Sequence, residues 1–497
     1  MQPISTRADN AGDHVELSAY QGRRGSDASD EENEPMRGLV SRPTAKQPAG
    51  VHGESSGSTF HWRVRLEAFA LSCALGFGSH FAWHLLGPLK EPIKQDLGIS
   101  NTGFGALQSS LSVLATVTPV LGGMLVDRVG CDEAALLSTS TVLVGLVVLM
   151  LSMAFGGFYG SLFGLAMIGV GSNWVTTAQD AAMVRVYPEA RGRRHRPAPQ
   201  PLDPSLGPGK RREHRSEVAL MFGLLFSIGK LFSFLSNGVA LHLYESLHSV
   251  VRVFAVGLLI ALGSVLAAMI QWRRRWRWAR YVDPAVTAET LRLARIQSAW
   301  WDGVGILSPE VRCYLVLEFL LGACWQPFLH LSSNMIKVLY NIEAKHAAWL
   351  ASITVAIPIV MNPLVGMFLD RTQRRTWAMM AGTMFLLLAF SSMLYSHRDG
   401  FASALPPLLV SFSISFTPLA MVTVAPRLVP ANRFGLLLGL HRCLENTGAV
   451  WVGSIAGPVQ DFSLRNGHED DGTEGYIGVV RLFVLLGLGA FTAACVV

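Results

Sequence analysis

The sequence Gly123-Met124-Leu125-Val126-Asp127-Arg128 recurs in a second form as Gly366-Met367-Phe368-Leu369-Asp370-Arg371. Each copy ends a long apolar segment, places a glycine four residues before an Asp-Arg pair, and follows a proline, Pro119 or Pro363. Glycine lets two helices approach closely, whereas an Asp-Arg pair is costly in hydrocarbon and suits a helix end. One copy alone is compatible with an ordinary helix end. Two copies at corresponding places indicate a duplicated unit of membrane helices.

The composition independently indicates a membrane protein. The chain has 497 residues, of which 50% are hydrophobic and only 15% charged, and its mean hydropathy is +0.36. Soluble proteins carry about a quarter charged residues, and a transmembrane helix needs about 20 apolar residues. The sequence therefore predicts an all-α membrane protein of twelve transmembrane helices arranged as two six-helix bundles. The predicted spans are 66–88, 103–126, 134–153, 158–183, 217–240, 250–271, 312–334, 346–369, 376–395, 402–427, 434–458 and 477–497.

The positions of the basic residues predict the orientation. The net charge is +6, and most arginines lie in loops after even-numbered spans, as in Arg191-Gly192-Arg193-Arg194 and Arg273-Arg274-Arg275. The opposite loops hold few basic residues, among them Lys90 and Lys337. This asymmetry follows the positive-inside rule and predicts that both termini are cytoplasmic. It argues against binding of nucleic acid.

The predicted organisation has four parts. Residues 1–60 are polar and lack apolar periodicity, which predicts a disordered cytoplasmic tail. Residues 61–272 form the first bundle, 273–308 a cytoplasmic loop between the bundles, and 309–497 the second bundle. The first bundle contains a basic, proline-rich insertion at 185–216, which we interpret as a solvated loop attracted to anionic lipid.

The repeated motif resembles the cytoplasmic gate motif of the major facilitator superfamily, G-x-x-x-D-R/K-x-G-x-R/K. In that family the motif stabilises the outward-facing state, so the resemblance implies gating roles for residues of both copies. The first copy departs from the pattern, because Cys131-Asp132-Glu133 stands where basic residues are usual. The implied gating residues are Gly123, Asp127, Arg128, Gly366, Asp370 and Arg371.

Three further segments resemble one branch of that family, the branch of lysosomal dipeptide transporters. They are His84-Leu85-Leu86-Gly87-Pro88-Leu89-Lys90, Gln95-Asp96-Leu97-Gly98-Ile99 and Ser227-Ile228-Gly229-Lys230-Leu231. The signatures of drug antiporters, sugar porters and proton-coupled oligopeptide transporters are absent from the corresponding helices. The resemblance implies a lysosomal or vacuolar membrane, and either a homodimer or an accessory membrane glycoprotein as partner.

Ionisable residues inside the spans are the candidate binding residues, because a charge in lipid is costly and usually faces a cavity or a partner. Lys230 is expected to contact a solute carboxylate, and Glu318 either to meet a solute amine or to pair with Lys230. The alternatives are a structural ion pair for Lys230, an interfacial acid for Glu318, an intrahelical pair within the eleventh span, and simple packing for the uncharged candidates. The candidate substrate-binding residues are Lys230, Glu318, His441, Arg442, Glu445, Asn173 and Trp325.

These features predict a secondary transporter or uniporter rather than an enzyme. The sequence contains no catalytic triad, Walker loop or metal-ligand spacing, so we expect no cofactor and no metal. The favoured hypothesis is alternating-access transport of a small organic solute, in particular dipeptides, across a lysosome- or vacuole-like membrane. The alternatives are a plasma-membrane porter for another organic anion and a transport-dead scaffold or sensor. The sequence leaves open the solute, the coupling to protons, the organelle, the oligomeric state and whether the insertion 185–216 is genuine.

Overall fold

The computed structural model describes residues 56–187, 217–279, 308–395, 400–429, 433–466 and 473–496. All of them belong to one compact unit, Glu54–Val497. The predicted tail falls outside the described residues except at its end, as do most of the insertion 185–216 and most of the loop 273–308.

The described residues of the first half form a succession of helices. These are α1 (Ser56–Leu75), α2 (Phe77–Leu85), α3 (Lys90–Leu97), α4 (Asn101–Val113), the short 3-10 helix η1 (Leu114–Thr116), α5 (Thr118–Val129), α6 (Cys131–Ala154), α7 (Phe158–Val186), α8 (Val218–Leu247) and α9 (Val250–Ala279). Because α1 continues into α2, and α4 and η1 continue into α5, these helices form six long helical segments.

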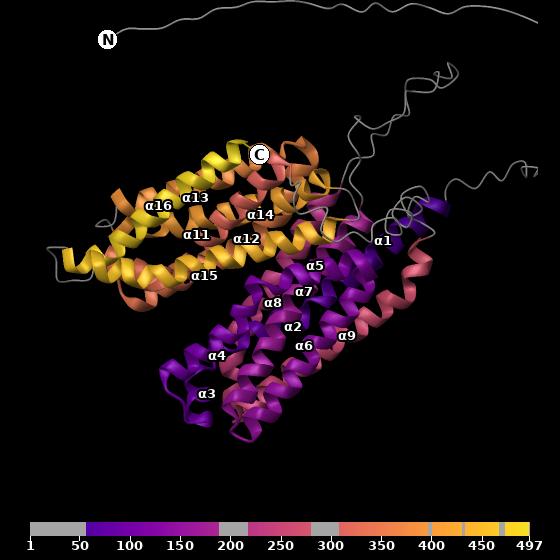
Figure 1. Cartoon of the computed structure of the whole chain (residues 1–497), viewed down its shortest axis with the longest axis horizontal. Helices are drawn as coiled ribbons and strands as arrows, with labels where there is room; N and C mark the ends of the chain where they lie inside the picture. The colour runs from indigo at the N-terminus through magenta and orange to yellow at the C-terminus, as the bar shows by residue number, and fades with distance from the viewer. Residues whose placement is uncertain are drawn as a thin grey trace, which may run out of the picture. The chain divides into compact units, whose positions relative to one another are not determined.

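The described residues of the second half form six more long helical segments. Its helices are α11 (Pro309–Tyr340), α12 (Ala344–Thr372), α13 (Arg375–Tyr395), the 3-10 helix η4 (Gly400–Ala404), α14 (Leu405–Leu428), α15 (Phe434–Asn466) and α16 (Thr473–Val496). The all-α fold predicted from the sequence is confirmed. In Figure 1 the helices α1–α9 form one group and α11–α16 another, with α15 against α5 and α12 against α8.

The lengths and apolarity of the helices show where polar residues concentrate. Eight helices are long and apolar enough to cross a membrane, and two bent pairs raise the number to ten. The two long helices that do not meet this criterion are α7 and α15, which carry Asp180 and Arg442 among other polar residues. Polar residues at membrane depth are tolerated where they face protein. The composition of α7 and α15 therefore points to the interior of the bundle pair.

Two of the predicted spans are broken, for local reasons. The second span bends by 47° between η1 and α5, where Pro119 lies in the first turn of α5 and lacks an amide hydrogen. The first span is interrupted at Gly76, and α3 follows it at 70°. The sequence did not predict α3.

Two helices extend beyond the predicted limits. α1 begins at Ser56, inside the range assigned to the tail, and α9 continues to Ala279, past residue 272. A helix that has already formed lengthens at little cost, because each added residue also adds a hydrogen bond. The limits at residues 60 and 272, which were predicted from polar composition alone, therefore lie closer to the apolar segments than the ends of these helices do.

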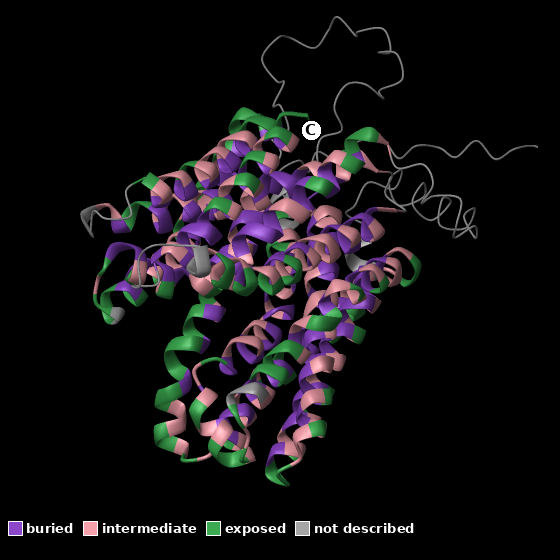
Figure 2. Ribbon diagram, turned by 60° about the vertical axis from the view of Figure 1, so that its left-hand side comes forward, coloured by how far each residue is buried: buried purple, intermediate pink, exposed green. Residues whose placement is uncertain are grey.

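The outward surfaces of the helices are apolar. Figure 2 shows buried residues along the helix faces that meet other helices and exposed residues on the remaining faces. Exposed side chains include Tyr159, Phe163, Val360, Trp377 and Leu485, each more than 60% accessible. Large apolar side chains exposed in this number fit a hydrocarbon environment rather than water.

Candidate functional site

The repeated motif holds the two halves together through two matching contacts. The Asp127 carboxylate accepts hydrogen bonds from the backbone amides of Gly435 and Leu436, both at 2.7 Å. These amides belong to the first turn of α15, where amide hydrogens have no partner within the helix and the helix dipole favours an anion. An aspartate at the end of α5 thus caps a helix of the other half.

The second copy makes the same contact in the opposite direction. Asp370, at the end of α12, accepts hydrogen bonds from the amides of Ala219 at 3.1 Å and Leu220 at 2.8 Å, at the start of α8. We call this end of the bundles, where α5 and α12 finish and α8 and α15 begin, the gate end. Arg128 and Arg371 are exposed there.

The glycines of the motif make these contacts possible. A Cβ atom on Gly123 would lie 2.1 Å from the carbonyl oxygen of Gly435, and one on Gly366 would lie 2.4 Å from the carbonyl oxygen of Ala219. A Cβ on Gly435 would lie 2.5 Å from the carbonyl oxygen of Gly123. Only glycine allows backbones to approach this closely.

The departure of the first copy from the family pattern has a structural counterpart. Asp132, which is buried, pairs with both terminal nitrogens of Arg185 at 2.5 and 2.7 Å and accepts a hydrogen bond from Gln271 at 2.9 Å. Glu133 pairs with Arg275. The acidic residues therefore lie at the start of α6, where the helix dipole favours them, and their basic partners come from α7 and α9.

We expect Gly435→Ala to weaken the contact between the two halves at the gate end. Its methyl group would press on backbone and on the Asp127 carboxylate, and overpacking of this kind costs about 1–3 kcal/mol, or about 5- to 150-fold in the population that forms this contact. Pulsed-EPR distances between labels at Val129 and Arg433 should show a larger share of long distances. Gly453→Ala on the same helix is the control, because nothing lies within 4 Å of its added Cβ. Equal distance distributions for the two variants would contradict the role of Gly435.

Above the gate end, Arg442 of α15 connects the halves. One of its terminal nitrogens lies 2.9 Å from a carboxylate oxygen of Glu445, and the other lies 3.7 Å from Asp180 Oδ2 on α7. The Asp180 side chain is only 2% exposed. Arg442 and Glu445 thus form the intrahelical pair that their spacing allows, and Arg442 also faces an acid of the other half.

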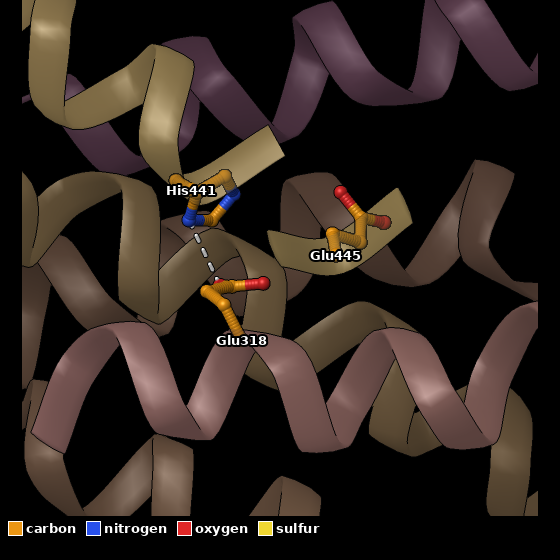
Figure 3. Close-up of side chains that lie close together, drawn as sticks. All are labelled: Glu318, His441 and Glu445. Carbon is orange, nitrogen blue, oxygen red and sulfur yellow. Dashed lines mark ion pairs between the residues drawn. The ribbon is translucent and has the colours of Figure 1, made fainter. Parts of the chain in front are cut away.

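Glu318 of α11 meets the same stripe of α15. His441 Nδ1 lies 3.0 Å from Glu318 Oε1 and 2.8 Å from the hydroxyl of Tyr314. Figure 3 shows Glu318 and His441 pointing toward one another, with Glu445 beside them. Ligand atoms of Glu318, His441 and Glu445 lie within 4.8 Å of one another, close enough to hold a cation. Sequence spacing did not predict this grouping, because Glu318 comes from a different helix.

Lys230 of α8 is half-buried and lies beside the same stripe. The charges of Glu445 and Arg442 act on Lys230, yet no hydrogen bond or ion pair of Lys230 is found among the described residues. Within that part of the chain, Glu445 contacts Arg442, and Glu318 contacts His441 rather than Lys230.

The uncharged candidates are placed differently. Asn173 of α7 lies 3.4 Å from the side-chain amide of Asn446, which also donates to the carbonyl of Ala115 at 3.1 Å. Asn173 therefore lies at the contact between the halves. Trp325 is buried and donates to the hydroxyl of Ser413 at 3.2 Å. That bond joins α11 to α14 within one half, which is the packing role left open by the sequence.

Three residues near this site were missed by the sequence analysis. Asp180 lies within a predicted span and is ionisable, so the signal for it was present in the sequence. Tyr314 becomes relevant only through its bond to His441. His80 of α2 lies against Gly229, since a Cβ built there would be 2.9 Å from His80 Nε2, and the charges of Lys230 and Arg442 act on it.

We refer to the charged residues from four helices as the central charged cluster. It contains three carboxyl groups, one lysine, one arginine and one histidine. Its members are Asp180, Lys230, Glu318, His441, Arg442 and Glu445. Both halves contribute, and an arrangement of this kind at membrane depth is typical of a solute or ion pathway.

The fold and the site define a class of membrane transporter. Residues 72–453 match the Major Facilitator Superfamily, and the chain belongs to that family. Among solved structures, the outward-conformation transporter FucP aligns with 86% of this chain and 97% of its own at a TM-score of 0.58 and 13% identity. An outward-facing bacterial homologue of the iron transporter ferroportin aligns with 87% and 98% at a TM-score of 0.61 and 12% identity. At these identities the likeness shows the fold.

Curated relatives narrow the comparison. The lysosomal dipeptide transporter MFSD1 of Mus musculus is 23% identical over 417 residues, covering 80% of each chain. The MFSD1 protein of Homo sapiens is 22% identical, with 80% of each chain covered. The MFSD1 protein of Danio rerio is also 22% identical, with 81% of this chain and 82% of the relative covered. The chain is thus a multi-pass transporter of this superfamily, similar to lysosomal transporters.

Proposed function

We propose that this protein moves a small zwitterionic solute, in particular a dipeptide, across a lysosome- or vacuole-like membrane by alternating access. The observation that carries the proposal is the central charged cluster, in which Lys230 has no ion-pair partner among the described residues. An ammonium group at membrane depth needs water or an anion, and a solute carboxylate supplies one. The names of the curated relatives support the choice of dipeptides.

The arrangement suits a solute with charges at both ends. Lys230 and Arg442 offer cations for the solute carboxylate, and Glu445, which lies 2.9 Å from Arg442, offers an anion for the solute amine. A zwitterion adds no net charge to the buried cluster. A simple organic anion adds one negative charge, which a buried site must neutralise.

The positive-inside pattern supports a gate end that faces the cytoplasm, together with both termini. Because Asp127 and Asp370 bond across the two halves at the gate end, the described arrangement would then be closed on the cytoplasmic side. Association with a second copy or with an accessory membrane glycoprotein is a further proposal, which native mass measurement of the purified protein tests.

Uptake by proteoliposomes tests the function directly. We expect labelled dipeptides to accumulate faster than in protein-free liposomes, and unlabelled dipeptides to compete. Unlabelled monocarboxylates should compete poorly, because they lack the amine that Glu445 would bind. Uptake of monocarboxylates without dipeptide uptake would instead favour the organic-anion porter. The specific argument for that alternative is Lys230, which has no ion-pair partner among the described residues. Absence of uptake and binding for every solute, with folded protein, would favour the scaffold.

A further inference from the structure

Two backbone carbonyls at the break in the second span have lost their helical partners, and Pro119 is the cause. In a regular helix the carbonyl of Ala115 would accept a hydrogen bond from the amide of residue 119, but proline has no amide hydrogen. The carbonyl of Thr116 would accept from the amide of Val120, which instead donates to the carbonyl of Val117 at 3.3 Å. The break between η1 and α5 therefore leaves both carbonyls open to donors from other elements.

Side chains of α15, which belongs to the other half, supply those donors. The side-chain amide of Asn446 donates to the carbonyl of Ala115 at 3.1 Å. The thiol of Cys443, one helical turn away on the same face of α15, donates to the carbonyl of Thr116. Asn446 also donates to the carbonyl of Arg442 at 2.8 Å, which fixes its side chain against its own helix. Buried carbonyls without a donor are costly, so these bonds stabilise the contact between the halves.

We propose that Asn446 and Cys443 are positioning residues that form a carbonyl latch, which holds α15 against the broken span by bonding the carbonyls of Ala115 and Thr116. The latch lies on the same pair of helices as the gate-end contact of Asp127, but deeper between the halves. When the halves separate at the gate end, both carbonyls lose donors that their own helix cannot replace. The inference rests on alternating access, which is part of the proposed function, and not on the identity of the solute.

The repeated motif provides an internal comparison, because the contact of α8 with α12 corresponds to that of α15 with α5. A Cβ atom added to Gly439 of α15 would lie 2.4 Å from the carbonyl oxygen of Pro119. A Cβ atom added to Gly223 of α8 would also lie 2.4 Å from a carbonyl oxygen, that of Asn362. These two glycines therefore occupy corresponding places in the two halves.

The side chains of α8 that correspond to the latch make no such bonds. Counted onward from the two glycines, Ser227 corresponds to Cys443, and Lys230 corresponds to Asn446. The hydroxyl of Ser227 has no hydrogen-bond partner among the described residues, and Lys230 has no ion pair there. The latch is thus a feature of the contact between α5 and α15, and it leaves the α8 side of the central charged cluster to the solute.

Distances between two labels at the gate end test the latch. Pulsed EPR with labels on ketone side chains, introduced in place of Val129 and Arg433, leaves the native cysteines untouched. Asn446→Leu removes the donor and should raise the ratio of long to short distances by about 2- to 12-fold, the contribution of one hydrogen bond. Thr447→Val is the matched control and should keep the wild-type distances, because the Thr447 hydroxyl donates to the carbonyl of Cys443 in its own helix at 2.7 Å.

Pro119→Ala tests the cause of the latch. It restores an amide that can donate to the carbonyl of Ala115 within the helix, so separation of the halves no longer leaves that carbonyl without a donor. The ratio of long to short distances should therefore rise in Pro119→Ala as well. Adding Asn446→Leu to Pro119→Ala should then change the ratio clearly less than Asn446→Leu does alone, whereas the effects of independent packing contacts would multiply.

Two substitutions at Cys443 test the second bond. Cys443→Ser keeps a donor and should keep the wild-type distances. Cys443→Ala removes the donor and should raise the ratio of long to short distances, by less than Asn446→Leu does, because a thiol is a weak donor. Equal distances for the serine and alanine variants would remove Cys443 from the latch.

The outcomes separate the latch from the proposed function. Unchanged distances in folded Asn446→Leu overturn the latch, and so do effects of Asn446→Leu and Pro119→Ala that multiply in the double variant. If Asn446→Leu does not fold, Pro119→Ala decides by itself, because unchanged or shorter distances there also overturn the latch. The distances are measured without solute, so absence of dipeptide uptake by the wild type refutes the proposed function and not the latch.

Discussion

Replacing Lys230 by alanine is expected to abolish or sharply reduce uptake of a carboxylate-bearing solute while the protein still reaches its membrane. Hydrogen bonds to charged groups contribute about 1.5–3 kcal/mol, which corresponds to a loss of at least about tenfold in uptake at subsaturating solute. The fold should survive, because Lys230 is in no ion pair among the described residues. No buried partner is therefore left behind.

Two further variants make the experiment specific. Lys230→Arg should retain part of the uptake, because the charge survives while its geometry changes. Lys345→Ala removes an exposed lysine at the start of α12 and should transport normally. Normal uptake by Lys230→Ala would remove Lys230 from the site and leave the stripe of α15 as the next candidate.

Arg442→Gln should have the largest effect on stability as well as abolishing uptake. Arg442 faces Glu445 at 2.9 Å and Asp180 at 3.7 Å, so its loss leaves two acids without their cation. Breaking a buried pair by removing one partner costs about 3–5 kcal/mol. We expect a much lower thermal unfolding temperature in detergent and no measurable dipeptide uptake.

The double variant Arg442→Gln/Glu445→Gln separates stability from transport. It removes one charge of each sign, so the cluster returns to the charge count of the wild type and most of the thermal stability should return. Uptake should stay low, because the double variant lacks both an anion-binding and a cation-binding group of the proposed site. A double variant as unstable as Arg442→Gln would show that the charge count does not govern folding here. Restored uptake would show that neither residue binds solute.

Much of the architecture was predictable because its signals are local. Apolar segments long enough to span a membrane, and a motif repeated in both halves, depend only on residues close together in the sequence. The polar stripe of His441, Arg442 and Glu445 was also visible, since its members lie one helical turn apart.

Contacts between distant segments were not predictable in the same way. Nothing in the sequence indicates that Asp132 pairs with Arg185 or that Tyr314 occupies the bonding direction of His441. The position of Asp180 facing Arg442 depends on how α7 packs against α15.

The sequence by itself determined the membrane class, the two-fold repetition and the set of ionisable residues that have to avoid lipid. Hydrophobic length and charge placement follow from composition along the chain, so they need no knowledge of packing. The tertiary structure alone decided which acid faces which cation, because a charge pair is set by distances between helices remote in sequence. The same packing left Glu318 Oε1 and Asp180 Oδ1 without a donor and Lys230 without an ion-pair partner among the described residues, and the proposed function rests on the last of these features.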